Sequence, residues 1–318
     1  MAGFKTRTIK AILRGKVNAW LNTIDNEEVV KALRKDVLIT GGSIASMLIG
    51  ESVKDFDIYL RTKETAKLVA NYYLKIFSDE YSKAHAGEQL HAVVAEVYRM
   101  NLKGEGEMVV TIKNEGRNRN AVQMRGVADT TQSPDDMAEE MVEELNDEAL
   151  QDSFEKRTSK RYHPVFISDN AITLSNKIQI VMRFVGEPEV IHENYDFAHC
   201  KNYYDFAKDD LVLNQLALEC LMSKTLRYTG SLYPLCSVFR AKKFIERGWR
   251  ISAGELLKIC YQVSKIDFGD MEMLREQLVG VDALYFFNLM SKIKDHVDSG
   301  KTLDNDSLVN LIDEVFNA

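Results

Sequence analysis

The stretch VLITGGSIASMLIGESVKDFDIYL, residues 37–60, has the pattern of a strand, a glycine turn, a short helix and a second strand. It begins with an apolar run that stops at two glycines, as expected for a buried strand. Ser43 is expected to cap a helix over residues 44–48, which ends near Gly50. The second strand is expected over residues 55–60. We expect this strand–turn–helix–strand unit to form the centre of the fold.

The same unit carries a candidate site. Side chains alternate along a strand, so Asp55 and Asp57 are predicted to share one face. Two carboxylates placed in this way hold hard divalent cations such as Mg²⁺. The Gly42-Ser43 turn offers backbone N–H groups at a helix start, where phosphate binds. The combination indicates metal-assisted attack on a nucleotide phosphate. The plainer alternative is a strand–turn–helix unit whose two aspartates only face solvent.

Gly42-Ser43, followed by Asp55-Phe56-Asp57, resembles the signature of the polymerase-beta-like nucleotidyltransferase superfamily. The resemblance implies a mixed sheet with helices and transfer of NMP from an NTP to an acceptor hydroxyl. It also implies that Asp55 and Asp57 hold Mg²⁺ or Mn²⁺. The superfamily uses a third carboxylate on a neighbouring strand. Asp196 is the predicted third ligand, on an expected strand over residues 195–200. A strand-end aspartate that binds local backbone is the alternative interpretation.

The region around Asp196 can also be aligned with a known family in a second way. The run YDFAHCKNYYD, residues 195–205, is also similar to the RDFTxNALAYD motif of CCA-adding enzymes. In that family the third carboxylate lies on the preceding strand. The matching strand here, residues 178–184, offers Gln179 instead. This alignment implies that one metal ligand is missing, so that the enzyme is weakened, uses another residue or is inactive.

Composition limits the function classes. The chain has 318 residues, 45% of them hydrophobic, and a net charge of −7. It is therefore no generally basic nucleic-acid binder, and nucleic-acid contact needs local patches. The four cysteines lack CxxC or zinc spacing and predict free thiols in a reducing compartment. No apolar run is long enough to cross a membrane and no signal-peptide core is visible, so we expect a cytoplasmic protein without a membrane partner.

Two segments outside the candidate site are distinctive. Residues 4–22 predict an amphipathic helix with a basic face, which either contacts nucleic acid or packs on the core with its charges in solvent. Residues 114–164 look like a polar insertion between core strands, with an acidic helix over residues 134–155. Three roles are open for the insertion. It acts as a lid, it acts as a nucleic-acid mimic or protein-binding surface, or it is a surface segment without a regulatory role.

The C-terminal half is predicted to be helical from residue 211 onward. The segment YPLCSVFRAKKFIERGWRI, residues 233–251, displays Arg240, Lys242 and Lys243. It is similar to the DPLRxxRAxRFxxxLGF helix of CCA-adding enzymes and bacterial poly(A) polymerases, although Tyr233 and Cys236 depart from that pattern. The resemblance implies a helical neck and an RNA acceptor, with a tRNA 3′ end as the favoured case. The three basic residues are predicted to bind triphosphate or acceptor phosphates.

We therefore predict an α+β fold: a nucleotidyltransferase domain with a mixed sheet in residues 1–205, and an all-α domain in residues 206–318. The predicted partners are an NTP with Mg²⁺ or Mn²⁺ and an RNA acceptor. The alternatives are a toxin-like or protein-modifying nucleotidyltransferase, a catalytically inactive nucleotide- or RNA-binding protein, and an interaction protein that works through residues 134–155. The chain also resembles nucleotidyltransferase-like proteins of phages and large viruses.

Overall fold

A computed structural model describes residues 3–84, 90–114, 162–267, 273, 277, 292–293, 295–297 and 299–316. The predicted acidic helix over residues 134–155, and the protein contact predicted through it, lie outside the described residues. Nearly all of the predicted insertion, residues 114–164, does as well. Within the described residues, no helix is both long enough and apolar enough to cross a membrane.

Helices and strands are interspersed in the first two thirds of the chain. The helices are α1 (Thr6–Leu21), α2 (Glu27–Asp36), α3 (Gly42–Ile49), α4 (Lys63–Ala84), α7 (Pro188–Glu193), α8 (Gln215–Ser223), α9 (Pro234–Glu246), α10 (Ala253–Val263) and α13 (Asn305–Phe316). The strands are β1 (Val37–Thr40), β2 (Phe56–Leu60), β3 (Ala92–Met100), β4 (Gly106–Asn114), β5 (Pro164–Ile167), β6 (Ala171–Leu174), β7 (Ile178–Val185), β8 (Tyr203–Asp205), β9 (Asp210–Val212), β10 (Thr225–Leu226) and β11 (Arg250–Ile251).

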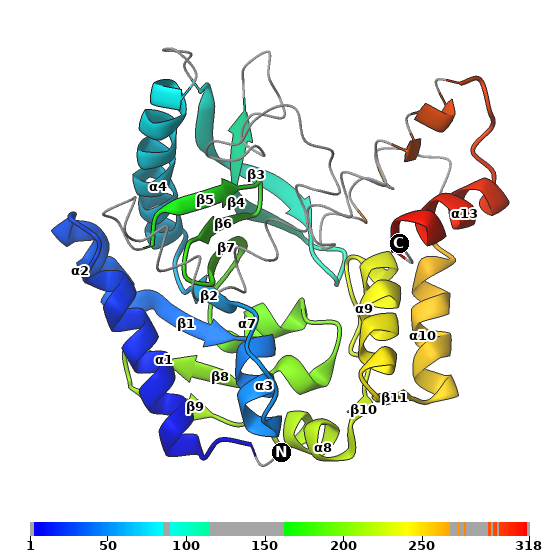
Figure 1. Ribbon diagram of the computed structural model, residues 1–318, viewed down its shortest axis with the longest axis horizontal. Helices are drawn as coiled ribbons and strands as arrows, with labels where there is room; N and C mark the ends of the chain where they lie inside the picture. Colours follow the sequence, from blue (N-terminus) through cyan, green and yellow to red (C-terminus); the bar gives the residue numbers. More distant parts are fainter. Residues whose placement is uncertain are drawn as a thin grey trace.

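A seven-stranded mixed sheet, in the order β5-β6-β7-β2-β1-β8-β9, forms the centre of the molecule (Figure 1). β2 runs parallel to β7 and antiparallel to β1. All four residues of β1 are buried, as their apolar run predicted. The predicted α+β class, with a mixed sheet and helices, is confirmed. β9 extends the sheet beyond residue 205, and the division into domains at that residue stays a prediction.

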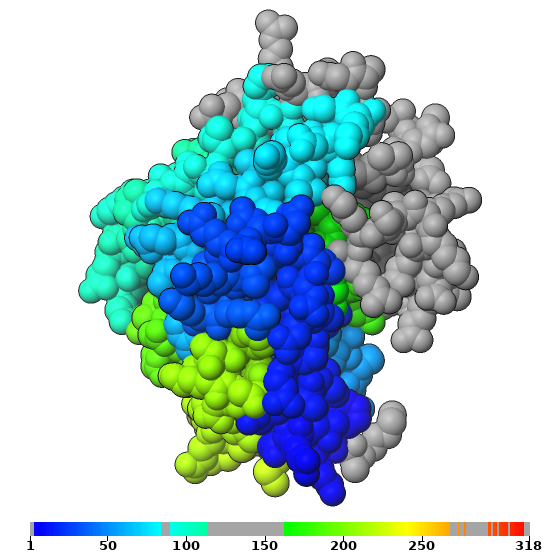
Figure 2. Space-filling model, turned by 90° about the vertical axis from the view of Figure 1, so that its left-hand side faces the viewer, coloured from blue at the N-terminus to red at the C-terminus, as the bar shows by residue number. Residues whose placement is uncertain are grey.

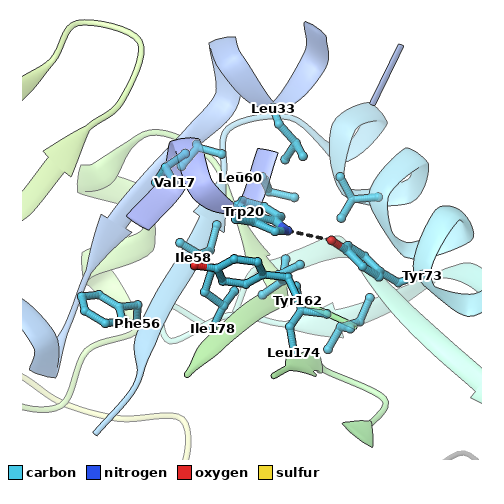
Figure 3. Packing of buried hydrophobic residues seen from close by; sticks show 14 of the residues in the cluster. Val17, Trp20, Leu33, Phe56, Ile58, Leu60, Tyr73, Tyr162, Leu174 and Ile178 are labelled. Atoms are coloured by element: carbon cyan, nitrogen blue, oxygen red, sulfur yellow. Dashed lines mark hydrogen bonds between the residues drawn. The ribbon is translucent and has the colours of Figure 1, made fainter. Parts of the chain in front are cut away.

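One face of the sheet packs against α1, α2 and α4, and its core is the largest apolar cluster of the described residues. Figure 2 shows these helices, in blue and cyan, side by side over this face. Phe56 and Ile58 of β2 and Ile178 of β7 point into the core (Figure 3). Trp20 and Tyr73 join α1 to α4 inside it. Because the alternate residues of β2 and β7 face this core, their remaining side chains, including Asp57, lie on the other face.

The N-terminal helix α1 packs on the core, which is the second of the two interpretations of residues 4–22. Its apolar residues Ile9, Leu13 and Val17 are fully buried. Part of its basic face is engaged within the molecule, because Lys10 and Arg14 form ion pairs with Asp209. From the sequence alone, both basic side chains could have contacted nucleic acid, but in the structure they pair with Asp209.

Two predicted elements in the second half are wrong. Residues 195–200 are not a strand: Phe197 forms one isolated bridge with Tyr228, and a short 3-10 helix η2 spans Ala198–Cys200. The start of the C-terminal half, predicted to be helical from residue 211 onward, contains the end of β9, then α8, then β10. The Asn214 side chain accepts a hydrogen bond from the Ala217 N–H and so starts α8 late.

An ion pair at the end of β8 gives a stability prediction. Arg61 Nη2 lies 2.7 Å from Asp205 Oδ2, and the Asp205 side chain is only 3% exposed. Burial by itself raises the pKa of Asp205, but the Lys208 backbone N–H and the Arg61 guanidinium bring it below its ordinary value. Removing Asp205 leaves Arg61 with Glu187 as its ion-pair partner, whose side chain is 61% exposed, and leaves the Lys208 N–H without its acceptor. We therefore expect Asp205→Ala to lower the free energy of unfolding by about 2 kcal/mol at pH 7.

The pH dependence of this loss follows from the lowered pKa. A carboxylate with a depressed folded-state pKa stabilises the fold above the unfolded-state pKa, and this contribution is lost as the pH falls through the folded-state value. The difference between wild type and Asp205→Ala should therefore shrink between about pH 5 and pH 2 in denaturant titrations. Asp209→Asn, at an exposed carboxylate that pairs with Lys10 and Arg14, is the control and should change stability less than Asp205→Ala does. A constant difference at all pH values would contradict the assignment.

Candidate functional site

The turn between β1 and α3 is built on glycines. Gly41 has φ 97° and ψ −150°, and Gly50 ends α3 with φ 74°, both in the region that side chains disfavour. α3 begins at Gly42, so the expected capping role of Ser43 is wrong and Gly41 occupies the cap position. The predicted helix end at Gly50 is confirmed. A Cβ atom at Gly42 would meet nothing within 4 Å, which leaves open space beside the helix start.

The turn lies directly against the second aspartate. A Cβ atom at Gly41 would approach Asp57 Oδ2 to 2.9 Å and the Tyr195 hydroxyl to 3.4 Å. Only glycine combines this close approach with the positive φ. The fold therefore brings the start of α3, the Asp57 carboxylate and the Tyr195 hydroxyl to one place. The contact with Tyr195 joins residues far apart in the chain, so no local signal in the sequence predicted it.

The two aspartates of the motif differ in environment. β2 begins at Phe56, so Asp55 stands just before the strand and is exposed, whereas Asp57 is partly buried. Burial, and then the charge of Asp55, raise the pKa of Asp57 well above its ordinary range, while the Arg240 guanidinium acts in the opposite direction. Two carboxylates that oppose each other's ionisation in this way favour a cation between them.

The neighbouring strand places an amide beside Asp57. β7 pairs in parallel with β2, and Gln179 is in register with Asp57. Because Ile178 and Ile180 face the core, Gln179 lies on the same face as Asp57. The second alignment pointed to this position, and the residue next to Asp57 on β7 carries no charge.

The predicted third carboxylate has a different setting. Asp196 lies between α7 and η2, and its Oδ2 is 2.6 Å from Arg240 Nη1 of α9. Within the described residues, no three His, Cys, Asp or Glu side chains come together as a metal-binding group. The structure thus brings Asp55 and Asp57 together and puts Asp196 in an ion pair. Its role as a third metal ligand stays a prediction.

The three basic residues of α9 do not act as one group. Arg240 and Lys242 are two residues apart on a helix, which turns their side chains about 200° from each other. Arg240 meets Asp196, while Lys242 forms an exposed i,i+4 pair with Glu246. Lys243 is also exposed. Arg240 is therefore the member of the three that faces the carboxylates.

A polar layer lies under the site on the face away from the main core. Thr40 donates a 2.8 Å hydrogen bond to the Asn202 carbonyl and lies 2.8 Å from His192 Nε2. The His192 ring in turn contacts Tyr195 at 5.2 Å between centroids. Burial lowers the pKa of His192 to about 4, so this imidazole is neutral at pH 7. The layer fixes the position of Tyr195 beside Gly41.

His199 is a buried core residue. It packs against Phe244 and Trp249, with ring centroids 4.6 and 4.5 Å away. Neither ring nitrogen has a hydrogen-bond partner among the described residues. Burial lowers the pKa of His199 to about 4. Because the imidazole is enclosed by these rings and is 1% exposed, it is not placed to take a proton from an acceptor hydroxyl.

The donor set fits a hard divalent cation. Mg²⁺ is commonly held by one or two protein carboxylates together with the phosphates of its nucleotide and water. Asp55 and Asp57 supply two carboxylates, and the Gln179 amide oxygen is a neutral donor of the same hard type. The charge conflict between the two aspartates would be relieved by such an ion.

The fold and this site define an α+β protein with a glycine turn and an acidic strand pair at the centre of a mixed sheet. The sequence profile described as "Gad2: Gabija anti-defense 2 family protein" matches residues 11–224, and the chain belongs to this family. A curated relative, "Gabija anti-defense 2" of Bacillus phage SPbetaL7, is 23% identical over 121 residues. That alignment covers 37% of this chain and 30% of the phage protein. The family match contains the motif and Asp196 but ends before α9.

The solved structures that the chain matches loosely include CCA-adding and tRNA-processing enzymes. The Thermotoga maritima CCA-adding enzyme complexed with tRNA has a TM-score of 0.37 and 13% identity, over 93% of this chain and 68% of that one. A CCA-adding enzyme with CTP has a TM-score of 0.40 and 14% identity, over 92% and 54%. A tRNA-processing enzyme with CTP has a TM-score of 0.36 and 12% identity, over 79% and 50%. Superpositions this loose carry no argument about activity, and the chain spans half of the last protein.

Proposed function

We propose that this chain is a metal-dependent nucleotidyltransferase that moves NMP from an NTP to an acceptor hydroxyl. The observation that supports it most is the contact of the Gly41 turn with the Asp57 carboxylate. This contact joins a phosphate-binding helix start to a carboxylate pair, the two parts that phosphoryl transfer needs. The superfamily resemblance of the same residues, Gly42-Ser43 and Asp55-Phe56-Asp57, points to the same reaction.

In this proposal, different residues of the chain bind the metal and the phosphates. Asp55 and Asp57 would hold Mg²⁺ or Mn²⁺, which when bound neutralises phosphate charge. The N–H groups at Gly42 and Ser43 would bind the β- and γ-phosphates. The Ser43 hydroxyl is buried and has no hydrogen-bond partner among the described residues, and a phosphate oxygen would provide one. The acceptor oxygen bonds to the α-phosphorus, the bond to the bridging oxygen breaks, pyrophosphate leaves, and the hydroxyl proton passes to solvent.

The acceptor we favour is RNA, with a tRNA 3′ end as the leading case. The basis is the similarity of residues 233–251 to the neck helix of CCA-adding enzymes, with Arg240 beside the carboxylates. The family is described as anti-defense and the curated relative comes from a phage, so the setting we propose is action against a host defence during phage infection. A hydroxyl on a host protein is the alternative acceptor, as in protein-modifying nucleotidyltransferases.

One labelling experiment tests the reaction. The purified protein is incubated with each α-³²P NTP, Mg²⁺ or Mn²⁺, total RNA and cell extract, and the products are run on one gel. An Asp55→Ala/Asp57→Ala double variant is the control. We expect label on RNA that is absent with the variant. Label on a protein band would select the alternative acceptor, and equal label with both proteins would refute the proposal.

A second candidate function is nucleotide binding without turnover. The observation that favours it is Gln179, which stands in register with Asp57 where the second alignment expects a carboxylate. This candidate predicts that the protein binds NTP with Mg²⁺, measured by calorimetry, and yields no labelled product under any condition of the gel experiment. Labelled product from wild type would exclude it.

A further inference from the structure

The backbone around Asp196 is fixed on a second segment of the chain. The Thr229 N–H donates to the Asp196 carbonyl at 2.8 Å, and the Ala198 N–H donates to the Arg227 carbonyl at 3.0 Å. Between these bonds, Phe197 bridges to Tyr228 and is fully buried. A residue held on both sides in this way presents its carboxylate from a rigid point.

Arg240 reaches that carboxylate from α9. The pair Arg240 Nη1–Asp196 Oδ2 is 2.6 Å long, which is typical of a strong charge-assisted hydrogen bond. The two partners rest on the same apolar cluster, because Ala241 and Phe244 of α9 pack with Phe197. Asp196 is 12% exposed at its side chain, whereas Arg240 is 40% exposed. The carboxylate is thus enclosed and the arginine side chain remains accessible.

The Arg240 charge extends to the motif. The charge of Asp196 is the main cause that raises the pKa of Arg240, and Arg240 in turn opposes the rise in the pKa of Asp57. The hydroxyl of Tyr195, the chain neighbour of Asp196, and the Asp57 carboxylate both lie against Gly41, so the Asp196–Arg240 pair is placed beside the motif. A metal ion at that pair and a guanidinium beside it would be two separate positive groups. The phosphate chain of a nucleotide is an anion long enough to engage both.

We propose, on the basis of the function proposed above, that Asp196 is a positioning residue: it acts through Arg240, holding the guanidinium as a clamp for the phosphate chain, and does not bind the metal. A metal ligand at Asp196 would compete with the guanidinium for the same carboxylate. The clamp joins the segment between α7 and η2 to α9, so it couples the predicted catalytic part to the helical part of the chain. This role accounts for an aspartate that lies off the strands beside β2.

Inorganic tripolyphosphate and Mn²⁺ separate the two roles. Tripolyphosphate binding in the presence of Mg²⁺ is measured by calorimetry, and Mn²⁺ binding without phosphate by electron paramagnetic resonance. We expect Asp196→Asn and Arg240→Gln each to weaken tripolyphosphate binding about 10-fold or more, the loss of one charge-assisted contact. The double variant should lose little beyond either single one, because the residues act as one unit. Mn²⁺ affinity should stay within about 2-fold of wild type.

Arg240→Lys and Asp209→Asn complete the set. Arg240→Lys keeps the charge without the planar fork and should show an intermediate loss. Asp209→Asn removes a carboxylate from an exposed arginine pair elsewhere and should change neither affinity. Thermal unfolding of each variant reports whether it is folded. Loss of Mn²⁺ binding in folded Asp196→Asn would overturn the proposal, as would unchanged tripolyphosphate binding.

These outcomes are independent of the transfer reaction. Tripolyphosphate binding that depends on both Asp196 and Arg240, in a protein that labels no acceptor, would refute the transferase and leave the clamp in place. Labelled product from wild type together with Mn²⁺ loss in Asp196→Asn would support the transferase and refute the clamp. Absence of tripolyphosphate binding by wild type refutes the clamp.

Discussion

Asp57→Asn should abolish nucleotide transfer and leave a protein that is at least as stable as wild type. Loss of a carboxylate that holds the metal removes several kcal/mol of charge stabilisation in the transition state, so we expect a fall of about 1,000-fold or more in rate. The asparagine keeps the size of the side chain beside Gly41. The activity is measured with the α-³²P NTP and acceptor identified by the gel experiment.

The stability half of this prediction follows from burial. The pKa of Asp57 is raised because the ionised carboxylate is buried and faces Asp55. A raised folded-state pKa means that the ionised carboxylate lowers the stability of the fold at neutral pH. Without metal, the free energy of unfolding of Asp57→Asn should therefore be roughly 1 kcal/mol higher than that of wild type. Mg²⁺ with a nucleotide should raise the melting temperature of wild type and not of the variant.

Asp55→Asn is the matched control, because Asp55 is exposed. It should also lose transfer but gain little stability. Equal rates of nucleotide transfer by Asp57→Asn and wild type would show that Asp57 has no role in the reaction. A melting temperature of Asp57→Asn well below that of wild type would instead show that the carboxylate is structural.

The central unit was predictable because its signals are local. The apolar run of β1, the positive-φ glycines and the alternation of β2 all act within a few residues, and each appears in the sequence where the structure needs it. The identity of the cap residue was missed by a small margin, since Gly41 rather than Ser43 precedes the first helical residue. Glycine at this position serves the close approach of Asp57, which is a tertiary requirement.

The segment around Asp196 was not predictable in the same way. The sequence YDFAHC alternates like a strand, yet Phe197, Ala198 and His199 are buried in succession, which a 3-10 turn allows and a strand on a half-covered sheet does not. Its partners, Tyr228 and Arg240, are 31 and 44 residues away. No periodicity within the segment reports such contacts, and so the ion pair of Asp196 appears only in the fold.

Trp20→Ala should have the largest effect on stability. Trp20 is fully buried between α1 and α4, and its Nε1–H donates to the Tyr73 hydroxyl at 2.6 Å (Figure 3). The variant loses the packing of the ring, leaves a cavity, and removes the donor to a buried hydroxyl. Core tryptophan to alanine changes cost about 3–5 kcal/mol, which is a large part of the stability of a typical domain. We expect a variant that is mostly unfolded at 37 °C or is recovered as aggregate.

Trp20→Phe and Tyr73→Phe separate the hydrogen bond from the packing. Each single change leaves one buried polar group without its partner, at about 1–3 kcal/mol. The double variant removes both groups, so its loss should be smaller than the sum of the two. Guanidinium unfolding followed by far-UV circular dichroism gives all four values and does not depend on tryptophan emission. Additive losses would contradict the bond, and a loss below about 1.5 kcal/mol in Trp20→Ala would contradict the buried position of the ring.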